Sequence, residues 1–212
     1  LIRENFSPVE IAKAYSEAGA QAISVLTEED FFAGNLVFIN EVKSVVSLPV
    51  LRKDFIFEAY QVYESRYYGA DAILLIADIL SKDVLVELIA LADSLGMDCL
   101  VESHTEKDLK KVLSLKVNPL VVSDKPSLKK KNTVNFAVGL NNRDLHSLEV
   151  DLKNTEKLYP LVPKEKVVVV ESGIKTYQDV LFLKIFGVNS ILVGESILRA
   201  GDLKAKILDL MG

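Results

Sequence analysis

The sequence predicts a parallel (β/α)8 barrel of which seven strands are present and the first is missing, and three observations lead to this fold class. Seven short apolar runs alternate with longer amphipathic segments, which is typical of strands covered by helices in parallel α/β proteins. Successive runs are separated by about one strand–loop–helix–loop unit. Several runs end in polar or charged residues, as expected where buried strands emerge at the mouth of a barrel.

The elements follow from this spacing. The predicted strands begin near Ala22, Pro49, Ala72, Asp98, Ala137, Val167 and Ser190, which are 27, 23, 26, 39, 30 and 23 residues apart. Between them, apolar residues recur at helical intervals in residues 8–18, 59–68, 81–95 and 105–115. Glycines stand where four of the helices should stop, and we interpret them as left-handed helix caps. They are Gly19, Gly69, Gly96 and Gly187.

Composition favours one domain over residues 1–212. Half of the composition is hydrophobic, which suffices for a sizeable core. The net charge of −5 is spread along the chain and argues against nucleic-acid binding. No apolar run approaches the ~20 residues of a membrane span. With no signal peptide at the start and one cysteine inside an apolar run, Cys99, we expect a cytoplasmic monomer that binds a small molecule.

Polar residues at the predicted strand ends are the candidate catalytic groups. Lys53 ends the run that begins at Leu48, and Glu102, Asn141 and Glu171 end three later runs. A lysine at the carboxyl end of a buried strand meets substrate at the barrel mouth, where its pKa can be tuned by its surroundings. Such a ring of polar residues is not needed by a packed core, so the sequence predicts a catalytic site there.

These same runs carry a family resemblance. The segments AISVLTE, LPVLRKDFI, GADAILLIA, LVES, GLNNRDL, VVVVESGI and ILVGESIL resemble, in this order, indole-3-glycerol phosphate synthase of tryptophan biosynthesis. The resemblance covers nearly the whole chain. It implies a substrate, a carboxyphenylamino deoxyribulose phosphate, that closes a ring onto its own ketone and then loses carbon dioxide and water.

The resemblance also implies roles for individual residues. Lys53 would be the general acid at the ketone, and Glu102 would accept a proton during the dehydration. Asn141, Glu171 and Ser172 would hold polar groups of the substrate. The apolar slot for the anthranilate ring would be lined by five residues. They are Phe32, Phe55, Leu74, Leu145 and Ile174.

Glycine-containing turns after the last two strands predict a phosphate site. Backbone N–H groups come close together in such turns, next to helix N-termini, and barrel enzymes often bind phosphate there. The predicted phosphate-binding residues are Gly173, Gly194, Glu195 and Ser196. His104 and His146 form no metal-ligand pattern with cysteines or carboxylates, and we expect neither a metal nor a redox cofactor.

Two departures from the family are expected to matter. The family's first strand and loop supply a glutamate, a second lysine and a serine that are absent here, so two strand edges should lack partners. If the reaction needs that lysine and glutamate, the chain should be nearly inactive even when it is folded. Residues 121–136 form an insertion, which we interpret as a solvated surface loop at the end of the barrel opposite the site.

Three other functions stay open. A Schiff-base aldolase would use neutral Lys53 as its nucleophile, with Arg52 beside it as a cation able to lower the lysine pKa. Alternation along the strand, however, sends the two side chains to opposite faces. A phosphoribosyl isomerase would need a cysteine–aspartate pair at strand ends, and Cys99 lies too early in its strand. A truncated barrel could also serve as a non-catalytic scaffold or complex subunit.

Overall fold

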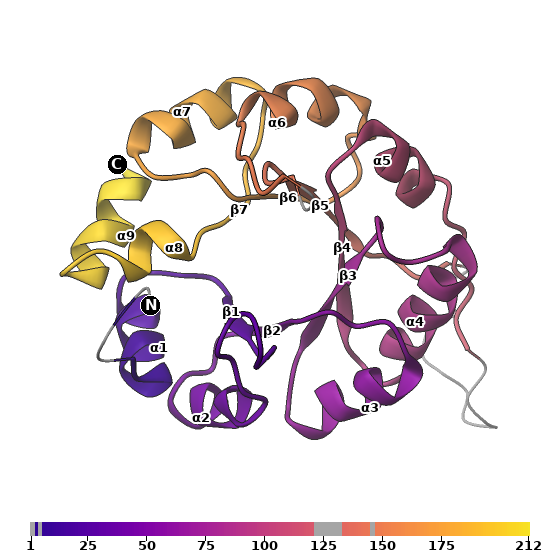
Figure 1. Cartoon of the computed structure of the whole chain (residues 1–212), viewed down its shortest axis with the longest axis horizontal. Helices are drawn as coiled ribbons and strands as arrows, with labels where there is room; N and C mark the ends of the chain where they lie inside the picture. Colours follow the sequence, from indigo (N-terminus) through magenta and orange to yellow (C-terminus); the bar gives the residue numbers. More distant parts are fainter. Residues whose placement is uncertain (1–2, 4–5, 121–132, 145–146) are drawn as a thin grey trace.

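Seven parallel strands form one sheet in sequence order, β1 to β7, and curl around a common axis (Figure 1). This computed structural model describes residues 3, 6–120, 133–144 and 147–212. Each predicted strand start is confirmed to within one residue. The strands are β1 (Ile23–Leu26), β2 (Val50–Lys53), β3 (Ala72–Ile76), β4 (Asp98–Ser103), β5 (Ala137–Asn141), β6 (Val168–Glu171) and β7 (Ile191–Leu192).

Helices surround the sheet, and local sequence signals set their ends. Ser7 and Thr105 accept hydrogen bonds from backbone N–H groups in the first turns of α1 and α5. The four glycines predicted as caps have φ between 74° and 93°, which confirms their left-handed conformation. The helices are α1 (Pro8–Glu17), α2 (Val37–Val45), α3 (Ala59–Tyr67), α4 (Lys82–Ser94), α5 (Glu106–Leu113), α6 (Lys153–Leu158), the 3-10 helix η1 (Tyr159–Leu161), α7 (Tyr177–Ile185), α8 (Glu195–Leu198) and α9 (Leu203–Met211).

The described strands do not form a closed sheet, whereas the surrounding helices form a continuous layer. Among the residues described, β1 pairs only with β2 and β7 pairs only with β6, so these strands form the sheet edges. The outer layer nevertheless continues past this opening, because α1 packs against both α2 and α9 (Figure 1). Arg3 donates to the carbonyl oxygens of Leu198 and Ala200, and Glu17 pairs with Lys204. The two ends of the chain are thereby joined through the helices.

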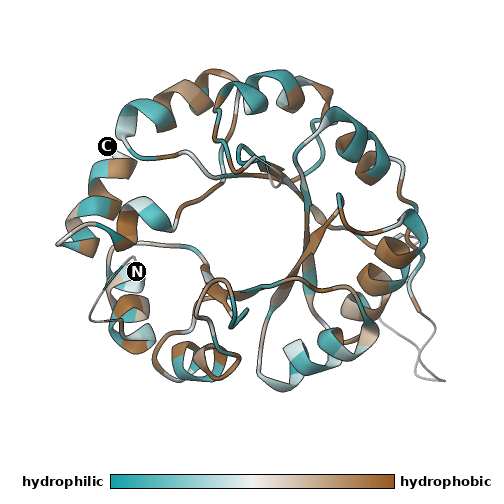
Figure 2. Cartoon of the chain, in the orientation of Figure 1, coloured by the Kyte–Doolittle hydropathy of each residue, from teal (hydrophilic) through white to brown (hydrophobic). Residues whose placement is uncertain are grey.

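Two hydrophobic clusters divide the core. The larger one fills the space between the strands and the surrounding helices, where Figure 2 shows hydrophobic residues along the strands and on helix faces. The smaller one occupies the inside of the curled sheet and consists of Leu51, Leu74, Ile76 and Leu100. Because side chains alternate along a strand, the residues that follow these at strand ends, Lys53 and Glu102 among them, also face inward.

The predicted insertion lies largely outside the described residues, which resume at residue 133. Val134 and Phe136 are buried, and they lead into the N-terminal end of β5. That end is opposite to Asn141, on the expected side of the barrel. The prediction of a solvated loop is wrong for Val134 and Phe136, because their apolar side chains pack into the larger core cluster. No helix of the described segments is long and apolar enough to cross a membrane.

Candidate active site

Lys53 lies between two buried carboxylates at the carboxyl ends of the strands. Its Nζ atom is 3.4 Å from Glu102 Oε2 and 3.4 Å from Glu171 Oε2. The Lys53 side chain keeps 26% of its surface exposed, whereas both glutamate side chains are 2% exposed. The three residues come from β2, β4 and β6, and alternate strands supply each layer of side chains in barrels of this kind. The structure thus brings together three residues that the sequence placed 49 and 69 positions apart.

The charges in this trio set its protonation. Burial disfavours the Lys53 ammonium, but Glu171 and Glu102 together outweigh burial and raise the pKa of Lys53. Burial also raises the pKa of Glu171, to about 8, with a further contribution from the Glu102 carboxylate and an opposing one from Lys53. At neutral pH the site therefore holds a cationic amine beside a carboxylic acid. A cationic amine cannot attack a carbonyl, which disfavours the Schiff-base aldolase.

Gly139 makes room for the Glu171 carboxylate, a requirement that the sequence did not reveal. A Cβ atom at position 139 would lie 2.7 Å from Glu171 Oε1 and 3.1 Å from Glu102 Cα. The missing side chain thus allows the carboxylate of β6 to lie over β5. Glu171 Oε1 is buried and has no hydrogen-bond partner among the described residues. This oxygen can therefore accept a hydrogen bond from a substrate or carry a proton.

Asn141 orients Glu102. Its Nδ2 donates to Glu102 Oε1 at 3.0 Å, and its Oδ1 accepts from the Arg143 backbone at 2.9 Å. His104 Nδ1 lies 2.9 Å from the Asn141 carbonyl oxygen, and Nε2 lies 3.2 Å from Asp144 Oδ2. The His104–Asp144 contact was not foreseen. It holds the loop after β5 against the end of β4.

The turn after β6 has an unusual backbone. Ser172 has φ of 67° and Gly173 has φ of 82°, and the first value is rare for a residue with a side chain. Asn142 stabilises this turn, because its Nδ2 donates to the Ser172 carbonyl at 3.1 Å. A Cβ at Gly173 would lie 2.8 Å from Val150 Cγ1. Gly173 is therefore required by conformation and by packing, whatever it binds.

The turn after β7 combines open space with engaged side chains. Nothing lies within 4 Å of the position a Cβ would take at Gly194. The Glu195 carboxylate, however, faces Arg143 Nη2 at 3.5 Å and Arg199 Nε at 2.9 Å, and Ser196 Oγ donates to the Ile174 carbonyl. The side chains of Glu195 and Ser196 are therefore occupied, and only their backbone N–H groups remain suited to an anion.

The predicted ring slot is assembled only in part. Phe32 and Phe55 are 52% and 37% exposed, and their ring centroids are 6.4 Å apart. Leu74 and Ile174 are 1% and 3% exposed and belong to the inner and outer clusters respectively, so they do not join the two rings in one open surface. Leu145 lies outside the described residues.

Arg52 is oriented as alternation predicts. Its side chain is directed away from Lys53, toward α3, and forms ion pairs with Asp54 and Glu64. In the loop after β5, Arg143 and Asp144 contact Glu195 and His104 respectively. The described part of the chain contains no group of three or more histidine, cysteine or acidic side chains suited to a metal ion.

Fold and site together define a class of protein: a parallel β/α barrel with a lysine between two buried carboxylates at the carboxyl ends of its strands. Comparison with known proteins gives the family. The family model described as indole-3-glycerol phosphate synthase matches residues 1–125 and 114–210. The chain belongs to this family of decarboxylating lyases, which act on a small-molecule phosphate substrate in tryptophan biosynthesis.

Individual relatives agree. The indole-3-glycerol phosphate synthase of Dehalococcoides mccartyi (strain CBDB1) is 48% identical over 214 residues, which cover 100% of this chain and 76% of the relative. The enzyme of the same name from Acetivibrio thermocellus is 45% identical over 207 residues, 98% of this chain and 73% of the relative. These similarities favour the synthase over the aldolase and the scaffold.

Solved structures show the same fold at low identity. Thiamine phosphate pyrophosphorylase from Pyrococcus furiosus aligns with a TM-score of 0.68 at 14% identity, over 97% of this chain and 88% of that one. A chain of the tryptophan synthase complex from Pyrococcus furiosus aligns with a TM-score of 0.63 at 16% identity, over 96% and 91%. These matches confirm the parallel β/α barrel.

Proposed function

We propose that this chain closes 1-(2-carboxyphenylamino)-1-deoxyribulose 5-phosphate to indole-3-glycerol phosphate, with loss of carbon dioxide and water. The observation that carries the proposal is the Lys53 ammonium held between Glu102 and Glu171 at the mouth of the barrel. A ring closure onto a ketone needs an acid at the carbonyl oxygen and a base for later steps. This trio supplies both within one layer of side chains.

The proton balance assigns a role to each group. A bond forms between the ring carbon that carries the carboxylate and the ketone carbon, and Lys53 gives its proton to the ketone oxygen, which becomes a hydroxyl. The bond to the carboxylate then breaks, and its electrons return to the ring as carbon dioxide leaves. Finally Lys53, reprotonated after ring closure, gives a second proton to the hydroxyl, which departs as water while Glu102 accepts the proton lost from carbon.

Glu171 would restore the proton of Lys53. The overall reaction consumes one proton, because a carboxylate leaves as neutral carbon dioxide. Glu171 is protonated below about pH 8 and lies 3.4 Å from Lys53 Nζ. It is therefore placed to return a proton to the amine after the ring closes. This extends the role of Glu171 beyond holding a polar group of the substrate.

The two ends of the substrate would be held by different loops. We assign the phosphate to backbone N–H groups of Gly173, Gly194, Glu195 and Ser196, supported by the open space beside Gly194. Phe32 and Phe55 would flank the anthranilate ring, since their exposed rings lie 6.4 Å apart near the end of β2. Asn141 and Ser172 would contact polar groups between these ends.

The wider setting is also part of the proposal. It comprises a single catalytic domain over residues 1–212 that acts as a cytoplasmic monomer, without nucleic acid or membrane. The net charge of −5 supports the part of this that concerns nucleic acid. No metal or redox cofactor is invoked, because each step above is a proton transfer or a bond rearrangement within the substrate.

The test is the indole fluorescence that develops when this substrate is added to the chain. We expect turnover, and we expect Lys53→Ala to reduce it by about 10²-fold or more, the scale of general acid–base catalysis. A chain that remains folded by circular dichroism but produces no indole product, both as given and after an N-terminal strand of the family is added, would contradict the proposal. Turnover that survives Lys53→Ala would contradict the role of the lysine.

A further inference from the structure

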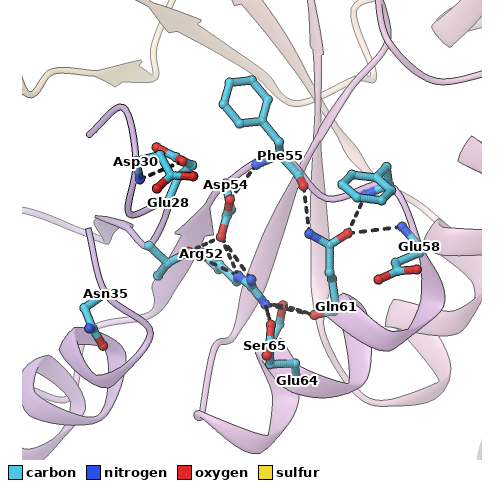
Figure 3. Close-up of polar contacts among 12 residues, drawn as sticks. Glu28, Asp30, Asn35, Arg52, Asp54, Phe55, Glu58, Gln61, Glu64 and Ser65 are labelled. Atoms are coloured by element: carbon cyan, nitrogen blue, oxygen red, sulfur yellow. Dashed lines mark hydrogen bonds and ion pairs between the residues drawn. The ribbon is translucent and has the colours of Figure 1, made fainter. Parts of the chain in front are cut away.

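Arg52 is a buried charge directly beside the proposed catalytic lysine, but on the opposite face of β2. Its side chain is 3% exposed, and Figure 3 shows it extending between Asp54 on one side and Glu64 and Ser65 of α3 on the other. No step of the proposed reaction uses it. Its burial therefore needs another explanation.

The near end of the guanidinium joins β1 to β2. Arg52 Nε donates to Thr27 Oγ1 at 3.2 Å and to Asp54 Oδ2 at 3.3 Å, and Nη2 donates to the same carboxylate oxygen at 2.9 Å. Thr27 Oγ1 in turn donates to Asp54 Oδ2 at 2.6 Å. Three side chains thus form a closed set of hydrogen bonds across the ends of two strands.

The far end anchors this set to α3. Arg52 Nη1 donates to the Gln61 carbonyl at 3.0 Å and to Ser65 Oγ at 3.1 Å, and it lies 2.9 Å from Glu64 Oε2. Only a planar guanidinium has donors arranged to reach both sides at once. The strand end is therefore held against a helix by one side chain.

Lys53 is enclosed by these contacts. Its neighbours on either side, Arg52 and Asp54, are bonded to each other, and its own carbonyl accepts from the Thr27 backbone at 3.2 Å. Asp54 Oδ1 also accepts from the Phe55 backbone at 2.8 Å. The backbone at Lys53 is thus held by its neighbouring strand, and the residues on both sides of it are held by the Arg52–Asp54 contacts, while the lysine side chain extends inward.

On β4, β5 and β6, the residue directly before the polar residue of the site is apolar, whereas on β2 it is an arginine. The residues that precede Glu102, Asn141 and Glu171 are Val101, Leu140 and Val170, and all three are fully buried and apolar. A buried ion pair often contributes no more stability than apolar packing of similar volume, so packing alone does not call for an arginine at position 52. The lysine differs from the glutamates in its long flexible stem, whose amine depends on a fixed strand end to stay in place.

We propose that Arg52, together with Thr27 and Asp54, positions Lys53 so that its amine stays between Glu102 and Glu171. Arg52 does not touch the substrate and is a positioning residue. The relevance to catalysis rests on the proposed function, but the position of the amine can be measured without any substrate.

The test compares Thr27→Val, which removes the hydroxyl at almost constant volume, with Thr27→Ser, which keeps it. The readout is the rate at which Lys53 reacts with an acylating reagent as a function of pH, followed by mass spectrometry of its peptide. Val62→Ala is the control for lost packing, because Val62 is fully buried on α3 and forms none of these hydrogen bonds. Arg52→Met removes the centre of the set.

An amine released from its two carboxylates should titrate at lower pH. We expect Lys53 in Thr27→Val to react about threefold faster or more at mildly alkaline pH, which corresponds to roughly half a pKa unit. Thr27→Ser and Val62→Ala should keep the original profile. The Lys53 profile should change more in Arg52→Met than in Thr27→Val. If the Arg52→Met protein does not fold, the Thr27→Val result alone tests the proposal.

Either result is decisive. An unchanged Lys53 profile in Thr27→Val would overturn the proposal and leave Arg52 as a structural ion pair. Enzyme kinetics give a second readout: loss of positioning should lower kcat by a larger factor than it changes KM. A changed profile in a chain that never forms indole product would uphold the positioning and reject the proposed function.

Discussion

Replacing Glu171 with glutamine should remove a large pH-dependent contribution to folding stability between about pH 4.5 and 8. The carboxyl is almost completely buried, and burial followed by the nearby Glu102 carboxylate raises its pKa from the ordinary 4.5 to about 8. Lys53 opposes this rise without cancelling it. Glutamine keeps the shape of the side chain but cannot titrate, so the comparison isolates this one group.

The sign follows from the direction of the shift. Because the pKa is higher in the folded chain, folding takes up a proton between about pH 4.5 and 8. The contribution to stability is therefore complete below about pH 4.5, is lost as the pH rises toward 8, and stays lost above it. One pH unit corresponds to about 1.4 kcal/mol per proton, so the loss is at most about 5 kcal/mol. That is a large share of the roughly 5–15 kcal/mol that stabilises an ordinary domain.

The assay is urea unfolding followed by circular dichroism at several pH values for both proteins. The unfolding free energy of the parent chain should fall with rising pH relative to Glu171→Gln. Glu165→Gln, at an exposed position, is the matched control and should follow the parent. A parent whose stability relative to Glu171→Gln is constant or increases over this range would refute the reasoning, because the carboxyl would then be ionised in the folded chain.

Three further predictions concern the surroundings of this carboxyl. Gly139→Ala should cost about 1–3 kcal/mol in thermal unfolding and lower turnover, because its Cβ would lie 2.7 Å from Glu171 Oε1; unchanged turnover would contradict this. Leu74→Ala should cost about 2–5 kcal/mol in urea unfolding, since Leu74 is fully buried inside the sheet; a cost below that range would mean that the site collapses. Lys53→Met should destabilise the chain more at pH 8 than at pH 5, because Glu102 and Glu171 lose their shared cation; equal losses in urea midpoint at both pH values would contradict it.

The sequence was sufficient for the fold and for the three central residues, for a physical reason. A buried parallel strand reads as a continuous apolar run, and its carboxyl end is marked by the first polar residue. In a barrel these ends converge, so Lys53, Glu102 and Glu171 could be placed together from strand ends alone. Their contacts of 3.4 Å confirm that reasoning for the geometry, while their chemical roles stay predictions.

Contacts between side chains on different strands could not be predicted in the same way. Gly139 looks like a weak strand residue in the sequence, and its purpose depends on how the Glu171 side chain bends across β5. Phe32 and Leu74 were both predicted to line the slot for the anthranilate ring, yet Phe32 is exposed on a loop and Leu74 is buried inside the sheet. Loop paths and strand registers decide these outcomes, and neither is encoded by the spacing of apolar runs.

The inner hydrophobic cluster links stability to chemistry in this barrel. Leu51 and Leu100 lie two residues before Lys53 and Glu102 on the same inward faces, so the site rests on an apolar floor. That floor excludes water from one side of the carboxylates, and exclusion of water is the largest cause of the raised pKa of Glu171. The packing that closes the barrel interior therefore also prepares an acid beside the lysine. A substitution that let water into the floor should lower stability and move this pKa toward its ordinary value in the same step.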